Sequence, residues 1–327
     1  MTEPTFGSSS SPTSPTLAGV SWERATIEKL VLAQVREQRA ARRWRLFMRL
    51  MWLIVIGAAV WFVYKAEAVN TPITTPHTAV IEIRGEIANG AEASAENVVS
   101  SLKTAFEDSG AQAIVLLIDS PGGSPVQAGI INDEITRLKA LHNKKVYAVV
   151  EETCASAAYY IAAAADSIYV DKASLVGSIG VLMDGFGFTG LMEKLGVERR
   201  LITAGSNKGM LDPFSPQDEA QRAYIQSMLN EIHTQFIAVV KQGRGERLKE
   251  TPDTFSGLIW SGQQAVNLGL ADGLGSLDYV AREIIKAEDI VDYTQRENLG
   301  WRLAKRFGAS VGEGVFDAAR AAGVQLR

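Results

Sequence analysis

An apolar run near the N-terminus constrains this chain more than any other feature. Residues 50–64 read LMWLIVIGAAVWFVY without a charge, and starting the run at Leu46 adds only Arg49 as a charged residue. A helix needs about 20 apolar residues to cross about 30 Å of hydrocarbon, and an arginine near its end can reach the headgroups. The sequence therefore predicts one transmembrane helix over residues 46–65.

The charges on either side of this run predict its orientation. Five arginines precede it closely, whereas only Lys65 follows, so the positive-inside rule places the N-terminus in the cytoplasm and the rest of the chain outside. A cleaved signal peptide is the competing interpretation, because Ala66-Glu67-Ala68 has the small-x-small form of a cleavage site. More than forty residues precede the apolar run, however, and an uncleaved anchor is therefore favoured.

The remaining chain divides by composition. Residues 1–45 form the expected cytoplasmic tail, whose Ser-, Thr- and Pro-rich beginning predicts partial disorder. Residues 21–45 carry apolar side chains at helical spacing and predict a helix that leads into the span. A helix lying on the membrane surface is the weaker alternative, since the polar face carries charges of both signs. We expect a linker over 66–78, a globular domain over 79–290 and a tail over 291–327 that packs on a neighbour, lies at the membrane or is disordered.

Apolar patterning within the globular domain predicts alternating strands and helices. Strands are expected over residues 79–83, 113–118, 146–150, 167–170 and 180–183. Helices are expected over residues 94–107, 126–142, 156–165, 191–195 and 216–242. This alternation is typical of an α/β fold with a mostly parallel sheet and covering helices.

Composition argues against several classes of function. A net charge of −4 gives no support to nucleic-acid binding, which normally needs a strongly basic face. His77, His142 and His233 lie far apart without zinc-ligand spacing, and we expect neither a metal nor another cofactor. Cys154 is the only cysteine, so no internal disulfide can form. We interpret it as a small packing residue, because nothing nearby in the sequence would lower its pKa.

The segment Asp119–Ser124 (DSPGGS) lies between a buried strand and a helix. Paired glycines let the backbone turn sharply and approach a ligand closely. Amides at a helix N-terminus point outward and favour negative charge, as an oxyanion hole requires. The alternative is an ordinary strand-to-helix turn, in which glycines are common.

A second segment, Glu152–Tyr160 (ETCASAAYY), also passes from a strand into a helix. Ser156 would begin this helix, with its hydroxyl and the Ala157 amide at the carboxyl edge of the sheet, where ligands bind in parallel sheets. Serine is also a good helix N-cap, which is the alternative interpretation. The segment has no G-x-S-x-G motif, so it does not indicate an α/β-hydrolase.

A serine nucleophile needs a base to accept its proton. No histidine is suitably placed, which argues against a Ser-His-Asp triad. A desolvated lysine is the other option, because burial favours the neutral amine. Lys208, in Ala204–Gly209 (AGSNKG), is the candidate; a solvated surface lysine is the alternative.

Four segments together are similar to the signal peptide peptidase A family. They are DSPGGS, ASAAYYIA around Ser156, LVGSIGV (Leu175–Val181) and TAGSNK ending at Lys208, in that family's order and spacing. The resemblance extends from about Val80 to Leu274 and includes WSGQQAVNLGLADGLG. It implies a ClpP/crotonase-like α/β fold of repeated β-β-α units. It also implies a bacterial inner-membrane peptidase with a periplasmic or extracytoplasmic catalytic domain.

The resemblance also implies roles for individual residues. Ser156 corresponds to the nucleophile, Lys208 to the general base and Ser178 to the serine that helps to orient the lysine. The implied reaction is hydrolysis, by this Ser-Lys dyad, of hydrophobic peptides such as cleaved signal peptides that remain in the membrane.

The oxyanion hole is implied to consist of backbone amides. Those of Gly122 or Gly123, together with that of Ala157, correspond to the family's donors. Ala157 and Ala158 stand where the family often has two glycines, and their methyl groups would narrow the cleft.

The expected partners are hydrophobic peptides, the lipid bilayer and further copies of the chain. Short members of the family have about half the length of the duplicated ones, and no second DSPGG occurs here, so we expect a ring-like homo-oligomer. Two other functions fit the sequence less well. Acyl-CoA chemistry is disfavoured by the outside location and by the lack of an identifiable glutamate base. A non-catalytic membrane scaffold or quality-control protein is disfavoured by the presence of both Ser156 and Lys208.

Overall fold

The computed structural model describes residues 27–29, 42–58, 61 and 75–296, and the chain forms two compact units, Met1–Thr71 and Pro72–Arg327. In the first unit, residues 42–58 are helical, and large apolar side chains such as Trp52, Leu53 and Ile54 are exposed. Among the described helices, none has both the length and the apolar character needed to cross a membrane. Residues 59–60 and 62–65 of the expected span lie outside the described residues, so the anchor stays a prediction.

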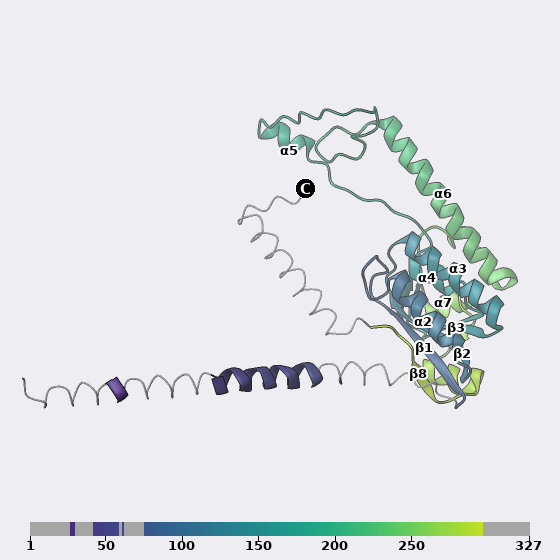
Figure 1. The fold of residues 1–327 in the computed structure, drawn as a ribbon. Helices are drawn as coiled ribbons and strands as arrows, with labels where there is room; N and C mark the ends of the chain where they lie inside the picture. The colour runs from purple at the N-terminus through teal and green to yellow at the C-terminus, as the bar shows by residue number, and fades with distance from the viewer. Residues whose placement is uncertain (1–26, 30–41, 59–60, 62–74, 297–327) are drawn as a thin grey trace, which may run out of the picture. The chain divides into compact units, whose positions relative to one another are not determined.

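The second unit is built on one eight-stranded sheet (Figure 1). Its strands are β1 (His77–Arg84), β2 (Ala111–Ser120), β3 (Lys145–Ala155), β4 (Ser167–Val170), β5 (Leu175–Gly177), β6 (Ile259–Ser261), β7 (Gly273–Leu274) and β8 (Ile290–Asp292). The main order is β6-β5-β3-β2-β1-β8, while β4 pairs with β3 and β7 pairs with β4. Every pairing is parallel except that of β5 with β6, which confirms the expected α/β class.

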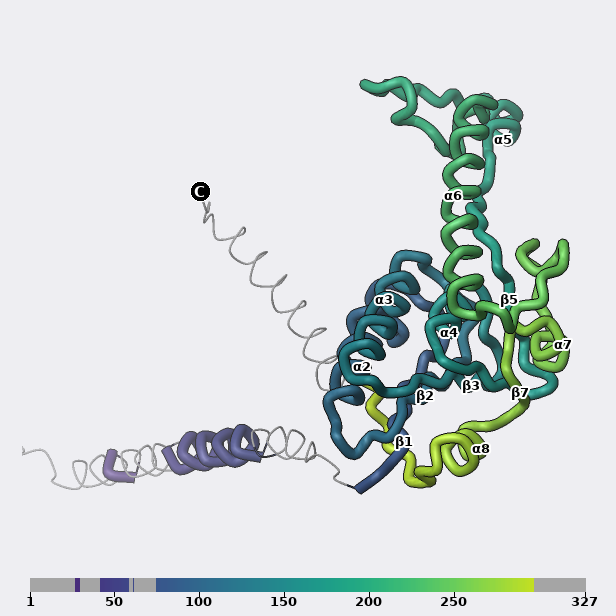
Figure 2. The backbone as a smooth tube through the Cα atoms, turned by 90° about the vertical axis from the view of Figure 1, so that its right-hand side faces the viewer, coloured from purple at the N-terminus to yellow at the C-terminus, as the bar shows by residue number. Residues whose placement is uncertain are grey.

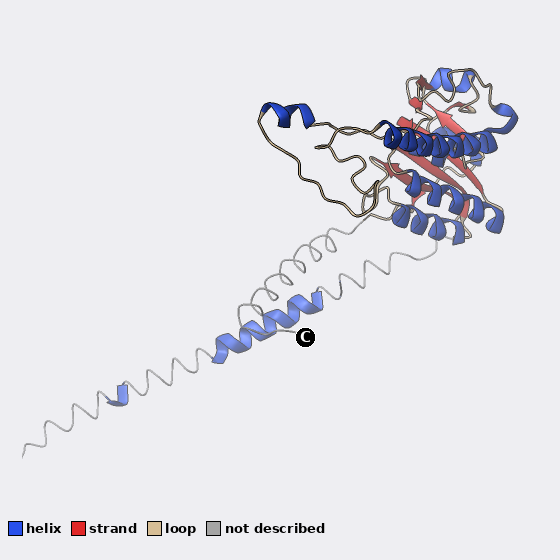
Figure 3. Ribbon diagram, turned by 90° about the horizontal axis from the view of Figure 1, so that it is seen from above, coloured by secondary structure: helices blue, strands red, loops and turns tan. Residues whose placement is uncertain are grey.

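Helices and helical turns connect these strands. They are α2 (Ala95–Glu107), α3 (Pro125–His142), α4 (Ala157–Ala162), α5 (Thr189–Lys194), α6 (Glu219–Arg244), η1 (Gly245–Arg247), α7 (Gly262–Asn267), α8 (Leu277–Tyr279) and the π-helical turn η2 (Val280–Ile285). Figure 2 shows α2, α3 and α4 lying together while α8 lies apart from them, and Figure 3 shows the helices in blue beside the red strands. The β8 strand extends past the boundary expected at residue 290.

The hydrophobic core has two parts because the sheet has two covered faces. The larger part joins the strands to the buried faces of α2, α3 and α4, with side chains such as Leu102, Ile131 and Ile161. The smaller part includes Val115 and Val149 on the other face, covered by α8 and η2. Strands buried on both faces explain why residues 113–118 form a continuous apolar run.

A repeated pattern underlies the sheet. A long strand is followed by a short extended segment and then by a helix. β1 is followed by a short segment that contains Ile87, and β2 is followed by a short segment that contains Gly123. These two residues form a parallel β-bridge. In β3 the second half changes neighbours and pairs with β5 before α4 begins. This order is consistent with the repeated β-β-α units implied by the resemblance.

Three sequence predictions differ from the structure. The helix expected over residues 156–165 is α4, which begins at Ala157 and already ends at Ala162. The strand expected over residues 180–183 is absent from the described fold: the β5–β6 ladder ends at the pair Gly177–Ile259, and the Gly180 amide turns back to the Ser178 carbonyl at 2.9 Å. The helix expected from residue 216 begins at Glu219 instead. There the side chain of Asp218 accepts a hydrogen bond of 2.9 Å from the Gln221 amide and caps α6.

Candidate active site

Ser156 lies where β3 ends and α4 begins, as the sequence predicted. Its backbone has φ 53° and ψ −123°, a positive-φ conformation that is uncommon for residues other than glycine. Its amide donates a hydrogen bond of 2.8 Å to the Gly177 carbonyl. Its hydroxyl does not cap α4, and none of the described residues bonds it. A strained serine with a free hydroxyl fits a nucleophile better than a helix N-cap.

Ser178 is brought beside Ser156 by the pairing of β3 with β5. The last residue pair of these two parallel strands is Ala155–Gly177, so each serine follows directly after it. Ser178 also has a positive φ of 50°, and its amide donates to the Leu258 carbonyl at 2.8 Å. Both serines line the same cavity.

The two glycines of the DSPGGS segment pack closely against different parts of the chain. A Cβ on Gly122 would come within 2.7 Å of the Ser156 Cβ, and one on Gly123 would come within 2.2 Å of the Ile87 carbonyl oxygen. These close approaches leave no room for a side chain at either position.

The amides of these glycines are not equivalent. That of Gly122 donates to the Ser120 hydroxyl at 3.1 Å, so it is already occupied. The amides of Gly123 and Ala157 have no acceptor within the described part of the chain. Gly123 and Ala157 are therefore the pair of free donors that could receive an oxyanion.

An apolar cavity of about 720 Å³ opens beside Ser156. Its walls come from the DSPGGS loop, the start of α4, the segment after β5 and one side of α6. The side chains Val181, Leu182, Met183, Met228 and Ile232 make much of this lining apolar. Such a site can hold the apolar side chain of an extended peptide.

Sequence reasoning did not assign α6 to this site. Met228, Ile232 and Phe236 recur every four residues and therefore share one side of the helix. This four-residue spacing is visible in the sequence. It predicts that one side of the helix is covered, but it does not predict which part of the molecule that side contacts. Ala157 lines the cavity as expected, whereas Ala158 is packed in the core, so only one of the two methyl groups narrows the cleft.

Lys208 lies in the segment between β5 and α6. The beginning of this segment lines the cavity, but the part that contains Lys208 does not. Figure 1 shows this segment extending away from the sheet. Lys208 is exposed, its amide bonds the Gly205 carbonyl in a turn, and it does not line the cavity. Within the described chain, the cavity lining contains no lysine, histidine, aspartate or glutamate. The structure thus brings Ser156 and Ser178 together without bringing Lys208 to them.

His233 and Cys154, interpreted from the sequence as an ordinary histidine and a packing residue, contact other parts of the fold. His233 forms a hydrogen bond of 3.1 Å with the Ile179 carbonyl and joins α6 to the loop of Ser178. Cys154 is completely buried, and burial raises the pKa of its thiol, which suits a packing residue. Among the described residues, no cluster of three or more His, Cys, Asp or Glu side chains could hold a metal.

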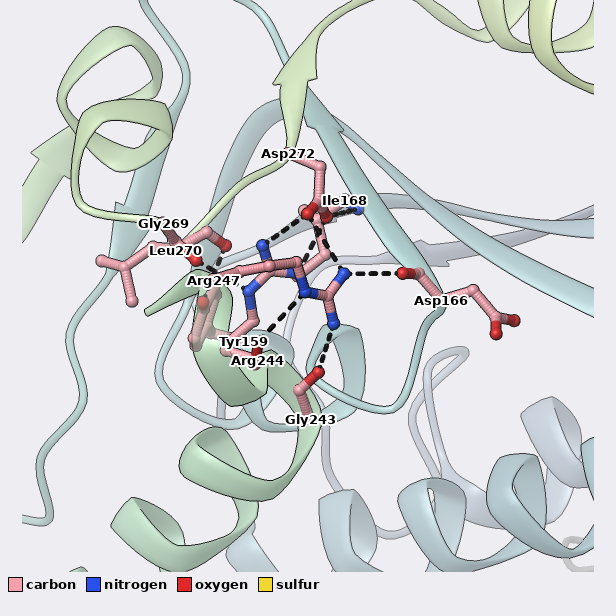
Figure 4. Close-up of polar contacts among 9 residues, drawn as sticks. All are labelled: Tyr159, Asp166, Ile168, Gly243, Arg244, Arg247, Gly269, Leu270 and Asp272. Carbon is pink, nitrogen blue, oxygen red and sulfur yellow. Dashed lines mark hydrogen bonds and ion pairs between the residues drawn. The ribbon is translucent and has the colours of Figure 1, made fainter. Parts of the chain in front are cut away.

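A buried polar cluster anchors α6 next to α4, the helix that follows Ser156 (Figure 4). Arg244, at the end of α6, is 1% exposed and donates to both carboxylate oxygens of Asp272 at 2.8 and 2.9 Å. It also donates to the Gly269 carbonyl at 2.8 Å. Tyr159, three residues after Ser156 on α4, donates to the Leu270 carbonyl at 2.7 Å. The segment 269–272 therefore holds α4 and α6 at the same place.

The charges in this cluster satisfy one another. Burial alone would raise the pKa of Asp272, but the hydrogen bonds and charge of Arg244 lower it. The Ile168 amide at 2.7 Å and Arg247 at 3.1 Å also bond this carboxylate. Because the carboxylate is so fully bonded, the cluster is better suited to fixing the cavity wall than to proton transfer.

Comparison with known proteins identifies relatives over much of the globular unit. Residues 139–290 match the family model described as "Peptidase family S49". The protein named "Na(+)/H(+) antiporter NhaA" of Brucella melitensis is 45% identical over 218 residues, which are 65% of this chain and 29% of that protein. The protein named "Putative protease MJ0651" of Methanocaldococcus jannaschii is 33% identical over 215 residues, which are 64% of this chain and 68% of that protein.

A third relative carries a more specific name. The protein named "Putative signal peptide peptidase SppA" of Enterococcus faecium is 31% identical over 199 residues, which are 61% of this chain and 58% of that protein. The chain spans less than a third of the length of the two relatives named as antiporters. The antiporter name therefore describes proteins much longer than the region they share with this chain.

Proposed function

Because the chain belongs to the signal peptide peptidase A family, peptidase family S49, we propose that it is a membrane-anchored serine endopeptidase with Ser156 as its nucleophile. One observation carries the proposal. Ser156 has a free hydroxyl beside an apolar cavity, and the free amides of Gly123 and Ala157 lie at the same turns. A nucleophile, an oxyanion hole and a substrate pocket are the parts that acyl transfer requires.

The proposed reaction has two steps. The Ser156 hydroxyl attacks the peptide carbonyl while its proton passes to the neutral amine of Lys208, and the carbonyl oxygen becomes an anion held by Gly123 and Ala157. Lys208 then gives the proton to the leaving amine, so that an acyl-serine remains. Water attacks the acyl-serine with the same lysine as base and releases the second product. Ser178 would donate a hydrogen bond that orients the lysine.

We propose that Lys208 reaches Ser156 between subunits of a ring-like homo-oligomer. The absence of a base from the described cavity lining supports this arrangement. Exposed apolar side chains on the same segment as Lys208 also support it, including Phe186, Leu195 and Ile202. Contact with a neighbouring subunit would cover this surface and remove water from the lysine, which favours its neutral form.

The proposed substrates are hydrophobic peptides such as signal peptides left in the membrane after cleavage. The apolar lining of the cavity supports this class. The proposed location is the bacterial inner membrane, with one helix over residues 46–65 and the catalytic domain on the extracytoplasmic side. The apolar run, the arginines before it and the exposed apolar residues of the described helix 42–58 support this location.

Separate Ser156→Ala and Lys208→Ala variants test the proposal in the full chain in mild detergent. We expect each variant to lose hydrolysis of a hydrophobic fluorogenic peptide and covalent labelling at position 156 by a fluorophosphonate, because Ser156→Ala removes the nucleophile and Lys208→Ala removes the base that activates it. Lys194→Ala, which alters another exposed lysine of the same segment, is the matched control and should remain active. Hydrolysis that persists in Ser156→Ala would exclude Ser156 as nucleophile. A wild-type chain without hydrolysis or labelling would instead favour a non-catalytic role.

A further inference from the structure

The strand that carries Ser156 contains an irregularity just before the nucleophile. β2 and β3 pair in regular parallel register up to the pair Ile118–Val150. The next pair is Ser120–Cys154, so β3 advances four residues where β2 advances two. Two additional residues of β3 are therefore accommodated between Val150 and Cys154, and this bulge sets how far Ser156 projects beyond the edge of the sheet.

The same bulge lies where β3 changes its neighbour on the other side. Val150 is the last residue that pairs with β4, and Thr153 is the first that pairs with β5. Residues 151–152 of β3 therefore lie outside the regular pairing with β2 on one side and with β4 and β5 on the other. Backbone amides and carbonyls that lose ladder partners need other partners if they are to stay in one conformation.

Two side chains supply those partners. A carboxylate oxygen of Asp119, on β2, accepts a hydrogen bond of 3.2 Å from the Thr153 amide. The Ser174 hydroxyl, in the loop before β5, donates to the Glu151 carbonyl at 2.6 Å. Ser174 is almost completely buried and also accepts a hydrogen bond of 3.0 Å from the Asp171 amide. The bulge is thus held from β2 on one side and from the β4–β5 loop on the other.

Asp119 and its neighbour Ser120 connect the nucleophile to the oxyanion loop. While the Asp119 side chain holds β3, the Ser120 hydroxyl accepts the Gly122 amide at 3.1 Å. The Asp119 carbonyl also accepts the Gly85 amide at 2.9 Å. One dipeptide of β2 therefore bonds both the strand that presents Ser156 and the loop that presents the Gly123 amide.

We infer that Asp119 and Ser174 are positioning residues of the peptidase, which hold the β3 bulge so that Ser156 faces the free amides of the oxyanion hole. This inference rests on the proposed function, because it assigns a role within the same site. Ser156 keeps a positive φ, and such a conformation persists only when surrounding bonds impose it. A small displacement of the nucleophile lowers the rate of acylation more than it lowers substrate binding, since binding is spread over the cavity.

The negative charge of Asp119 is a second way in which this residue could affect Ser156. Substitutions separate the effect of this charge from that of the hydrogen bond to the Thr153 amide. The neighbouring charges are those of Arg84 and Glu151, which form an ion pair of 2.7 Å with each other. Asp119→Asn removes the charge but keeps an oxygen that can accept the Thr153 amide. Asp119→Ala removes both.

The experiment measures peptide hydrolysis, fluorophosphonate labelling of Ser156 and hydrogen exchange of the Thr153 amide in the full chain. We expect Asp119→Ala to lower kcat and the labelling rate about 10- to 100-fold with little change in KM, and to speed exchange at Thr153. Asp119→Asn should stay within about threefold of wild type in all three, because its amide oxygen replaces the acceptor. Ser174→Ala should give a smaller loss, about 3- to 10-fold, because one clamp remains. Asp278→Ala, an exposed carboxylate on α8 outside the cavity lining, should change none of them.

The inference is wrong if folded Asp119→Ala labels Ser156 at the wild-type rate, or if Asp119→Asn is as slow as Asp119→Ala. It is also wrong if the rate of hydrogen exchange at the Thr153 amide is the same in all variants. This rate can be measured even in a chain that does not hydrolyse peptides. Failure of the proposed function is a different result, in which wild type is neither active nor labelled. If Asp119→Ala does not fold, the Ser174→Ala and Asp119→Asn variants decide the question by the same measurements.

Discussion

The two ends of α6 belong to different environments although they are parts of one 26-residue helix. At the C-terminal end, Phe236, Val240 and Arg244 are buried, and Arg244 is bonded to Asp272 beside the nucleophile helix. At the N-terminal end, no residue from Glu219 to Gln235 is buried in the described chain, and the preceding segment, which carries Lys208, is exposed. Packing within one chain thus fixes the surroundings of Ser156, the proposed nucleophile. It does not fix the exposed segment that carries Lys208, the proposed base.

This division explains how one helix can serve two purposes. Its middle lines the cavity through Met228 and Ile232, so the anchored end determines the shape of the substrate pocket. Its free end extends away from the sheet, and in the proposed oligomer this end contacts a neighbouring subunit. The contrast between the packed surroundings of Ser156, the proposed nucleophile, and the exposed position of Lys208, the proposed base, leads to four predictions.

The largest expected effect tests whether the two halves belong to different subunits. Ser156→Ala and Lys208→Ala should each lower kcat by at least about 10⁴-fold, because removing a member of the catalytic unit removes acylation. Coexpressed in one oligomer, the two inactive chains should regain about a quarter of wild-type activity, since about a quarter of the sites then combine an intact serine with an intact lysine.

The matched control for this mixture is the double variant coexpressed with either single variant, which should stay inactive. Peptide hydrolysis by purified mixed oligomers, carrying a different affinity tag on each chain, is the measurement. Mixed oligomers that form but regain nothing would show that the lysine does not act across subunits.

The next effect concerns the anchored end of α6. Arg244→Ala should destabilise the globular unit by roughly 3–5 kcal/mol, because it leaves the carboxylate of Asp272 without its buried partner. Thermal unfolding of the full chain in detergent measures this. Arg247→Ala is the comparison, since Arg247 bonds the same carboxylate from a 40% exposed position and should cost much less. Equal losses from the two variants would contradict the view that Arg244 is the anchor.

Acid should weaken the same anchor with a defined sign. The pKa of Asp272 is lowered in the folded chain from 3.8, so its contribution to stability is present above that value. It is lost as the pH falls through the lower, folded value. Asp272→Asn should be less stable than wild type near neutral pH, and its stability should fall less steeply below about pH 4. The measurement is the unfolding temperature as a function of pH. Parallel curves for the two chains would show that this carboxylate does not titrate as described.

The smallest expected effect lies at the free end. Ile202 is 94% exposed, so Ile202→Ser should change the stability of the globular unit by less than about 0.5 kcal/mol. Phe236→Ala, at the buried end, should cost about 3–5 kcal/mol. The Ile202 variant should nevertheless weaken oligomer formation, which light scattering in detergent measures. An oligomer unaffected by Ile202→Ser and by similar changes at Phe186 and Leu195 would exclude this segment as the subunit contact.

Sequence patterns predicted the parts of the fold that depend on local periodicity. The strand over residues 113–118 and the helix over 126–142 were expected because buried strands and amphipathic helices have distinctive spacing. The strand expected over 180–183 was wrong, because its apolar residues line a cavity instead of a ladder. Short strands such as β6 and β7 have no local signal, since their partners are distant in the sequence.

Part of the candidate site could also be predicted from the sequence. A strand-to-helix turn placed Ser156 at the sheet edge from the sequence alone, and the resemblance to a family placed Ser178 with it. Which side of α6 covers the cavity could not be predicted, because that choice depends on the buried bonds of Arg244 at the far end of the helix. The bulge in β3 was not predicted either, since register depends on side chains of other strands. The position of Lys208 relative to Ser156 requires a second chain in the present proposal.

The positive φ of Ser156 limits what this residue can become during evolution. Serine, alanine and cysteine all carry a Cβ, and each would adopt φ 53° at a cost of about 1–3 kcal/mol, whereas glycine adopts it freely. A descendant with no use for hydrolysis would therefore gain stability from glycine at this position. With Ser156 as the proposed nucleophile, a descendant that still cleaves peptides could not accept that substitution. The proposal therefore predicts glycine at position 156 only in relatives that retain the fold without the activity.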